Sequence, residues 1–168
     1  AAPLDVLLVR KLGVPGHEEL AMGAIADGGT RVLNQPLIDR LGVGAETVEA
    51  VARAEAAELE RRQALYRGGR PPAPVGGMTV VVVDDGLATG ASMRAALEGL
   101  RPSNPAALVA AVPVGAAEAC RALAPEADAV VCVRLPARFL AVGQAYEDFG
   151  PTPDDEVRAA LAASGGGR

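Results

Sequence analysis

Residues 79–83 form a short β-branched run, in which one threonine is followed by four valines. The run shows no polar alternation, so it favours a strand of a parallel sheet that is covered on both faces, and therefore a central strand. Residues 46–67 differ, because apolar side chains recur there at helical spacing among many charges. That pattern predicts a helix with one narrow apolar stripe and a solvated outer face.

The rest of the pattern alternates strands with helices. After the valine run we expect a helix at 92–101, a strand at 107–112, a helix at 116–123, a strand at 128–133 and a last helix at 154–163. Before it we expect a buried strand at 5–9 that ends at Arg10-Lys11, and a hairpin of strands 22–26 and 31–34 around Asp27-Gly28-Gly29. This order predicts an α/β fold of three layers, α/β/α, with a mainly parallel sheet and an antiparallel hairpin.

At 168 residues the chain is long enough for one domain with a buried core. We expect that domain to span residues 1–163 and to be followed by a flexible tail at 164–168. Residues 68–77 are rich in proline and glycine, so we expect a mobile loop, in a place that would suit a lid.

Composition and charge narrow the classes of function. The net charge is −5, and the chain has two phenylalanines, two tyrosines and no tryptophan, so aromatic platforms for nucleic acids are not expected. Cys120 and Cys132 have neither metal-ligand spacing nor a Cys-x-x-Cys pattern, and both are interpreted as reduced core residues. No secretory leader and no apolar stretch that could span a bilayer is found, which favours a soluble cytoplasmic protein without membrane partners.

The chemistry that the sequence indicates begins where the valine run ends. Asp84 and Asp85 fall at the carboxyl end of the expected strand, which is where ligands lie in open α/β sheets. Gly86 and Gly90 allow the chain to curl with several N–H groups toward one anion, and the helix that follows adds its positive end. The junction therefore predicts a site for a phosphorylated sugar.

Hydroxyl groups complete this expected phosphate site. Thr89 and Ser92 can donate hydrogen bonds to the phosphate, which leaves the two preceding carboxylates to accept hydrogen bonds from vicinal ribose hydroxyls or to bind a divalent cation. A Walker loop is excluded because the Gly-Lys-Ser/Thr ending is missing, and a dinucleotide fingerprint because Gly-x-Gly-x-x-Gly is absent. The remaining alternative is an ordinary strand-turn-helix of a doubly wound protein.

This segment, four valines followed by Asp-Asp-Gly-Leu-Ala-Thr-Gly-Ala-Ser, resembles the 5-phosphoribosyl-1-diphosphate (PRPP) signature of the type I phosphoribosyltransferase family. The resemblance implies the fold of that family, and it implies that Asp84 and Asp85 hold the ribose hydroxyls. It also implies that the turn binds the 5′-phosphate through Gly86, Leu87, Ala88, Thr89, Gly90, Ala91 and Ser92. Mg²⁺ is implied by the family and also by charge, because an acidic chain needs cations to neutralise a substrate with several phosphates.

Lys11 is the one lysine of the chain and follows Arg10 at the expected end of a buried strand. In the resembling family a strand that ends in Val-Arg-Lys opens the mobile catalytic loop, and its basic residues meet the diphosphate. The resemblance therefore implies catalytic roles for Arg10 and Lys11 beside Asp84 and Asp85. The alternative is a solvated strand end.

Residues 139–149 are similar to the hood of purine-type family members, in which an aromatic side chain covers the base. On this resemblance Phe139, Val142 and Tyr146 contact the base, although packing in the core is the alternative for the two aromatic residues. In the family a Val-Gly pair precedes an acid at the metal and diphosphate end. Here one extra residue lies between Gly143 and Asp148, so either Glu147 or Asp148 can take that place, and we assign Asp148 to the metal with Asp84 and Asp85.

Family members usually begin with a helix and a central strand, and that strand ends in a glycine-containing turn for diphosphate. This sequence starts with the strand expected at 5–9, so we expect the diphosphate turn and the middle of the sheet to be absent. Buried backbone groups on the flanking strands would lack partners, at about 1–3 kcal/mol each. We therefore hypothesise a fragment, a truncated product, or a gap that is closed by rearrangement or by a second copy, as in a homodimer.

The predicted function is transfer of a 5-phosphoribosyl group from PRPP to a nitrogen nucleophile such as a nucleobase, with release of diphosphate. The expected partners are small molecules, PRPP and an acceptor, and no nucleic acid. A non-catalytic PRPP- or nucleotide-binding regulatory module, or an inactive fragment, is the alternative, which the absent diphosphate turn favours. Hydrolysis of a phosphorylated sugar ranks last, because no Ser-His-Asp set or metal cluster is found.

Overall fold

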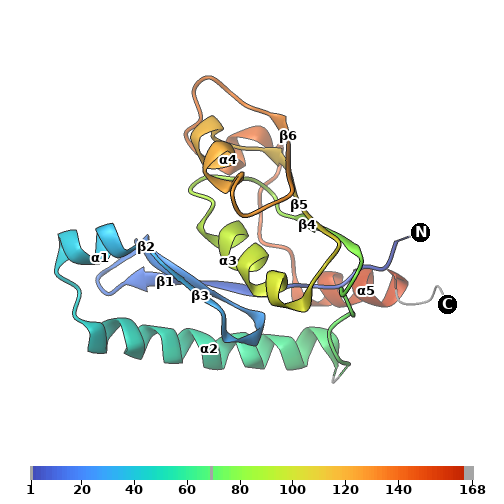
Figure 1. Ribbon diagram of the computed structural model, residues 1–168, viewed down its shortest axis with the longest axis horizontal. Helices are drawn as coiled ribbons and strands as arrows, with labels where there is room; N and C mark the ends of the chain where they lie inside the picture. The colour runs from blue at the N-terminus through green and yellow to red at the C-terminus, as the bar shows by residue number, and fades with distance from the viewer. Residues whose placement is uncertain (1, 69, 165–168) are drawn as a thin grey trace.

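A computed structural model describes residues 2–68 and 70–164 of the chain (Figure 1). The strands are β1 (Val9–Val14), β2 (His17–Ala26), β3 (Arg31–Leu33), β4 (Thr79–Val83), β5 (Ala107–Val114) and β6 (Ala129–Arg134). The α-helices are α1 (Gln35–Leu41), α2 (Ala45–Arg67), α3 (Ala91–Leu100), α4 (Ala117–Leu123) and α5 (Asp154–Ser164). Short 3-10 turns are η1 (Asp27–Gly29), η2 (Arg101–Ser103) and η3 (Val142–Ala145). Of the tail expected at 164–168, Ser164 ends α5, and residues 165–168 lie outside the described residues.

The first sheet is antiparallel, in the order β1-β2-β3. Gly16, at φ +79°, makes the turn between β1 and β2, because a residue without Cβ takes this backbone angle at little cost. The expected hairpin around Asp27-Gly28-Gly29 is confirmed as β2, η1 and β3.

The strand expected at 5–9 is wrong in its position. β1 begins at Val9 and runs through Arg10 and Lys11 to Val14, so both basic residues lie inside a strand and not at its end. The reason is pairing, because Arg10 and Lys11 lie opposite Ile25 and Ala24 of β2. The apolar letters before Val9 are instead part of a segment without regular structure, and its Val6 carbonyl accepts a hydrogen bond from Arg67 at 2.6 Å.

The second sheet is parallel, in the order β4-β5-β6. The expected parallel arrangement is therefore confirmed, but the expectation that the valine strand is central and covered on both faces is wrong for the described residues. β4 is an edge strand whose side chains alternate in burial, with Val80 and Val82 packed on the core and Val81 and Val83 54% and 71% exposed. Helices α3 and α4 pack on one face of this sheet, and on the other face Val81 and Val83 stay exposed, so continuous apolar sequence does not here mean continuous burial.

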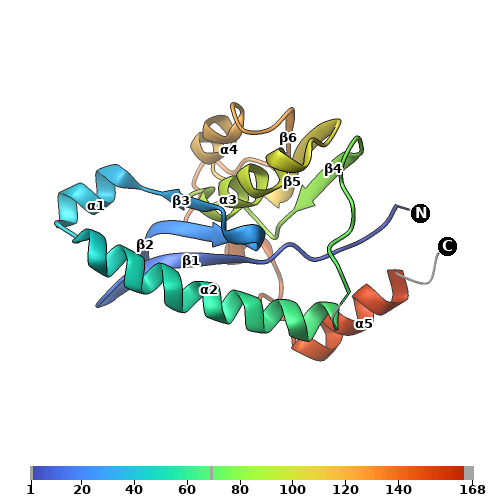
Figure 2. The ribbon, with the colours of Figure 1, turned by 60° about the horizontal axis from the view of Figure 1, so that its bottom comes forward.

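Figures 1 and 2 show how the layers are arranged: α2 lies along one face of the antiparallel sheet, and α3 lies between the antiparallel and the parallel sheet. Small residues allow α3 to approach the antiparallel sheet, where Ala95 packs against Ala24 and Ala26. On its other side α3 packs with α4 on the parallel sheet, through Leu97 and Leu123. The α/β class with a parallel sheet and an antiparallel hairpin is confirmed, but the strands form two three-stranded sheets.

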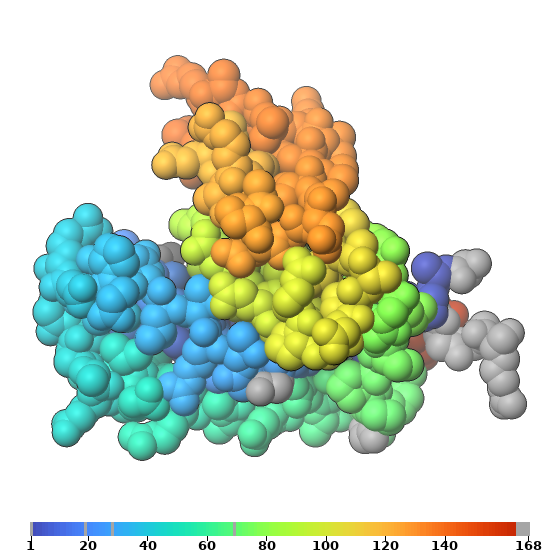
Figure 3. All heavy atoms as spheres, in the orientation of Figure 1, coloured from blue at the N-terminus to red at the C-terminus, as the bar shows by residue number. Residues whose placement is uncertain are grey.

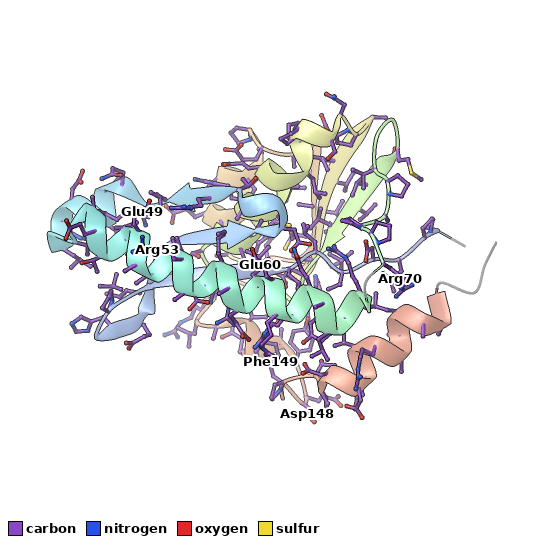
Figure 4. The ribbon with its side chains drawn as sticks, turned by 90° about the horizontal axis from the view of Figure 1, so that it is seen from below. Glu49, Arg53, Glu60, Arg70, Asp148 and Phe149 are labelled. Carbon is purple, nitrogen blue, oxygen red and sulfur yellow. The ribbon has the colours of Figure 1, made fainter. Side chains whose placement is uncertain are left out.

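The surface follows from these layers. The outer face of α2 is charged, as Glu49, Arg53 and Glu60 show in Figure 4. In the space-filling view the region from α4 to η3 stands as a lobe away from α2 (Figure 3). Within residues 2–68 and 70–164, no helix combines the length and the apolar character that crossing a membrane requires.

Candidate functional site

The loop between β4 and α3 forms the floor of a pocket of about 400 Å³. The buried side chain of Leu87 anchors this loop in the core of the parallel sheet. Its backbone continues the sheet by one bridge, because the Leu87 amide donates to the Val114 carbonyl at 3.0 Å and the Ala116 amide donates to the Leu87 carbonyl at 2.8 Å. The loop is therefore held from below while its upper side faces the pocket.

The peptide groups after Leu87 supply hydrogen-bond donors. In the described part of the chain, no acceptor is found for the backbone amides of Ala88, Thr89, Gly90 and Ser92. Gly90 caps α3 at φ +76°, and the ten residues of that helix end their positive dipole on the same loop. Unpaired amides at the start of a helix form a site for an anion such as a phosphate.

Two carboxylates stand beside these amides. Asp84 and Asp85 both line the pocket, and the Asp85 amide donates to Asp84 Oδ1 at 2.9 Å, which fixes the first carboxylate. Burial raises the pKa of the Asp84 carboxyl, and the negative charge of Asp85 adds to this, while the Asp85 amide and Lys11 act against it. An ionised pair at this place is stabilised by a cation or by hydroxyl donors of a ligand.

β1 divides its two basic residues between opposite faces, as strand geometry requires. Lys11 lines the pocket, and its positive charge acts on the Asp84 carboxyl. Arg10 faces α2, where its Nε lies 2.6 Å from Glu55 Oε2. The structure therefore brings Lys11 but not Arg10 to the pocket.

The segment around η3 closes the pocket on another side. The Tyr146 hydroxyl donates to the Asp85 carbonyl at 2.6 Å, and this bond ties the segment to the loop. Phe149 lines the pocket and contacts the Tyr146 ring, with ring centroids 5.2 Å apart. Gly143 makes room for Phe149, because a Cβ at position 143 would lie 2.8 Å from Phe149 Cδ1. Figure 4 shows Phe149 and Asp148 on the segment between η3 and α5.

Comparison with known proteins agrees with this geometry. The family model described as "Phosphoribosyl transferase domain" matches residues 16–148. The chain belongs to this family. Two curated proteins from two strains of Mycobacterium tuberculosis, MT0597 and Rv0571c, which are provisionally named phosphoribosyl transferases, are each 48% identical over 160 residues. These 160 residues are 95% of this chain but 36% of each relative, so the chain spans about a third of their length.

A solved structure supports the same assignment of fold. The crystal structure of TT1426 from Thermus thermophilus matches with a TM-score of 0.76 and 42% sequence identity, over 96% of this chain and 76% of that chain. The fold of this phosphoribosyl transferase domain is therefore shared with an experimentally determined structure.

Most of the residues that we expected at the site of the phosphoribosyl transferase domain come together in the one pocket. Its lining includes Lys11, Val142 and every residue from Asp84 to Ser92. Tyr146 touches the site through the Asp85 carbonyl. Four expected residues are not part of the lining: Arg10, the half-buried Phe139, Tyr146 and the exposed Asp148.

The place of Asp148 bears on the metal site of the phosphoribosyl transferase domain. Asp148 Oδ1 accepts a hydrogen bond from the Gly150 amide at 3.1 Å. Among the described residues, no three His, Cys, Asp or Glu side chains gather as a metal cluster, so Asp148 does not join Asp84 and Asp85. Two carboxylates alone suit Mg²⁺, which is usually bound through one or two carboxylates together with substrate phosphates. The donor set at Asp84 and Asp85 therefore fits the ion that the sequence led us to expect.

Phe149 and Met93 line the pocket and were missed by the sequence reasoning. Phe149 lies in the segment that resembles the hood, but Phe139 and Tyr146 were chosen as its aromatic residues. The feature of the sequence that could have indicated Phe149 is Gly143, six residues before it. A glycine has no side chain, so the Phe149 ring can pack directly against its backbone. Met93 carried no signal in the sequence, since it is a buried core residue of α3 that also lines the pocket.

Proposed function

We propose that this domain transfers a 5-phosphoribosyl group from PRPP to a nitrogen nucleophile, such as a nucleobase, with release of diphosphate. One observation carries the proposal: unpaired loop amides, two adjacent carboxylates and one ammonium group line the same pocket. These groups match, in order, a terminal phosphate, a ribose diol and a diphosphate. Membership of the phosphoribosyl transferase family supports the reaction type.

The 5′-phosphate would bind to the amides of Ala88, Thr89, Gly90 and Ser92. Such donors are fixed by the loop before the ligand arrives, so little conformational entropy is lost on binding. The hydroxyl groups of Thr89 and Ser92 add two donors that can rotate toward a phosphate oxygen. Thr89 Oγ1 accepts only a long hydrogen bond, 3.4 Å from the Ala91 amide, and so remains free to donate.

The ribose would bind to Asp84 and Asp85, whose carboxylates accept hydrogen bonds from the 2′- and 3′-hydroxyls. The same two residues would hold Mg²⁺, which supplies positive charge to the departing diphosphate when it is bound. Lys11 lines the same pocket and would neutralise further charge on the diphosphate. Phe149 would cover the sugar and exclude water from the reacting carbon.

The reaction needs no nucleophilic side chain. The bond from the anomeric carbon to the diphosphate breaks as the acceptor nitrogen approaches, and positive charge develops on the sugar in between. The domain's own contribution would be to hold both reactants in line and to place negative charge, from Asp84 and Asp85, near the developing cation.

The test is binding of PRPP in the presence of Mg²⁺, measured by calorimetry on the wild type and on the double variant Asp84→Asn with Asp85→Asn. We expect the double variant to lose Mg²⁺-dependent PRPP binding while it keeps weak binding of inorganic phosphate to the loop amides. Asp155→Asn, on the exposed first turn of α5, is the matched control and should leave both affinities unchanged. Equal PRPP affinity of the wild type and the double variant would refute the site.

A binding module without catalysis is the second candidate. The observation in its favour is that, among the described residues that line the pocket, Lys11 is the one basic side chain. The two candidates are separated by incubating the domain with PRPP, Mg²⁺ and a panel of nucleobases. Release of diphosphate that depends on an added base identifies the transferase, whereas binding of PRPP without release identifies the sensor.

A further inference from the structure

The two cysteines of the chain lie close together next to Gly115, which is bridged to Leu87 of the loop between β4 and α3; we call this loop, residues 84–90, the phosphate loop. Cys120 comes from the first turns of α4 and Cys132 from β6. A Cβ built on Gly115 would lie 3.0 Å from Cys120 Sγ and 3.3 Å from Cys132 Sγ, so both sulfur atoms border one small space.

Both thiols are free and partly accessible. Neither cysteine is in a disulfide, and both side chains are intermediate in burial. A metal site is not the explanation, because among the described residues no third Cys, His, Asp or Glu side chain joins the pair. Burial, and next the neighbouring Cys132 sulfur, raise the pKa of the Cys120 thiol to about 11, which agrees with two sulfur atoms in close contact.

We propose that Cys120 and Cys132 are a redox modification site, a dithiol that closes to an intramolecular disulfide by exchange with a low-molecular-weight disulfide such as oxidised glutathione. In the first step the thiolate of one cysteine attacks a sulfur of the reagent, a mixed disulfide forms, and one reagent thiol leaves. In the second step the other cysteine loses its proton and attacks the protein sulfur of the mixed disulfide, which expels the second reagent thiol. The protein dithiol is thereby oxidised, and the reagent disulfide is reduced to two thiols.

The disulfide would act on the loop through two direct contacts. The Cys132 thiol donates to the Arg134 carbonyl at 3.2 Å, and the same carbonyl accepts from the Gly115 amide at 3.1 Å. Oxidation removes the thiol donor. It also draws the two sulfur atoms to a bond of roughly 2.05 Å, so the space beside Gly115 changes shape. Gly115 is bridged to Leu87, the residue that anchors the loop, so oxidation is expected to shift the loop.

The experiment equilibrates the folded chain with buffers of reduced and oxidised glutathione, followed by acid quenching, alkylation and trypsin. Cleavage after Arg121 and Arg134 separates the cysteines, so a disulfide joins the peptide 95–121 to the peptide 122–134. We expect this joined peptide, and a loss of two hydrogen atoms in the intact mass of a monomer. The same chain in urea is the control, and the folded chain should close the bond at a ratio of oxidised to reduced glutathione at least about tenfold lower.

Several outcomes would overturn the site. One is uptake of a separate glutathione on each cysteine without the joined peptide. Another is absence of any reaction in the folded chain, and a third is closure no easier than in urea. Cys120→Ser and Cys132→Ser should each take up one glutathione and form no joined peptide. The wild-type measurement does not depend on whether these variants fold.

Nuclear magnetic resonance tests the coupling to the loop. On oxidation the backbone amide signals of Gly115 and Leu87 should shift, whereas the signal of Val51, in the middle of α2 and outside this core, should stay in place. A joined peptide with unchanged signals for Gly115 and Leu87 would overturn the coupling. None of these measurements uses a phosphoribosyl ligand, so they test the redox site independently of the proposed function.

Discussion

Gly90 sets the shape of the phosphate loop at the scale of a single residue. Its φ of +76° turns the chain from the loop into α3, and a side chain at this angle brings Cβ too close to the following carbonyl oxygen. A Cβ would also lie 3.1 Å from Leu87 Cδ2, the side chain that anchors the loop. The direction of the unpaired amides therefore depends on a residue that has no side chain.

Gly90→Ala is expected to lower the free energy of unfolding by about 1–2 kcal/mol, the cost of the left-handed conformation. Urea denaturation followed by circular dichroism measures the change. Gly99→Ala is the control in the same helix, because its φ is not positive and its nearest contact is 3.4 Å. It should be neutral or stabilising by up to about 1 kcal/mol. Equal losses in both variants would show that the backbone angle at Gly90 is not the cause.

The raised pKa of Asp84 gives a second prediction at this scale. The folded protein holds the Asp84 proton more tightly than the unfolded chain, so the contribution of Asp84 to stability falls as pH rises from 3.8 through the raised pKa. Asp84→Asn carries no charge and should therefore be more stable than the wild type at pH 7. The gain should be small, up to about 0.5 kcal/mol, since the carboxyl is only partly buried and the residue as a whole keeps contact with solvent, and it should vanish below the unfolded pKa. Urea midpoints at several pH values measure it, and a variant that is less stable at pH 7 would contradict it.

At the scale of elements, the two faces of β1 have different roles: one face attaches the strand to α2, and the other contributes a residue to the pocket. Arg10 binds Glu55 and fixes the strand to α2, while Lys11 on the other face lines the pocket. The side-chain period of two that strand pairing imposes gives neighbouring residues of the same charge different tasks. A strand end, as the sequence led us to expect, would have left both free to meet a ligand.

Lys11→Met is expected to weaken PRPP binding about 10- to 100-fold, the loss of a charged contact of roughly 1.5–3 kcal/mol. Binding of ribose 5-phosphate, which lacks the diphosphate, should stay within about twofold of the wild type. Arg10→Met should show the opposite pattern, with both affinities kept and stability lowered by up to about 1 kcal/mol. Calorimetry and urea denaturation decide between them, and equal losses of PRPP affinity would contradict the separation.

Most helices and strands could be predicted from the sequence, because their hydrophobic pattern and capping residues agree with the way they pack in the fold. α2 has a charged outer face and a glycine at each cap, so both its helical spacing of apolar residues and its two ends could be predicted from the sequence. α1 was missed because seven residues give too short a period, although Asn34 caps it and Pro36 stands in its first turn. The position of β1 was missed for a different reason, since its pairing with β2 decides where the strand runs.

At the scale of the whole molecule, Arg67 joins three distant segments. It is 8% exposed, and its guanidinium contacts the Asp27 carboxylate at 2.8 Å, the Val6 carbonyl at 2.6 Å and the Asp5 carboxylate at 3.5 Å. The end of α2, the segment before β1 and the turn after β2 are thereby held together. A buried cation with these partners fixes the edge of the antiparallel sheet from which Lys11 reaches the pocket.

Arg67→Met is expected to lower the free energy of unfolding by about 3 kcal/mol or more, because Asp27 would be left partly buried without its cation. Arg62→Met is the control on the same helix, where a partly exposed pair with Glu58 contributes at most about 1 kcal/mol. Urea denaturation at pH 7 measures both. Similar losses for the two variants would contradict the importance of burial.

The sequence predicted the candidate site better than the whole molecule. The residues from Asp84 to Ser92 are contiguous, so one strand-turn-helix brings them together without help from the rest of the chain. Arg10, Phe139 and Asp148 depend on how separate elements meet, and the structure does not place them in the lining. The exposure of Val81 and Val83 in β4 could not be predicted for the same reason. How deeply a strand is buried depends on which strands and helices pack around it, and the strand's own sequence does not show this.

The hydrogen bond from Tyr146 to the Asp85 carbonyl has a practical consequence. The chain contains two tyrosines and no tryptophan, so its intrinsic ultraviolet fluorescence comes from tyrosine alone. Tyr66 is not among the residues that line the pocket, and its hydroxyl donates to Asp154. Tyr66→Phe would therefore leave Tyr146 as the single tyrosine emitter. A ligand that alters the contact between Tyr146 and the loop would then change the emission intensity, and binding at this site can be followed optically without any attached dye.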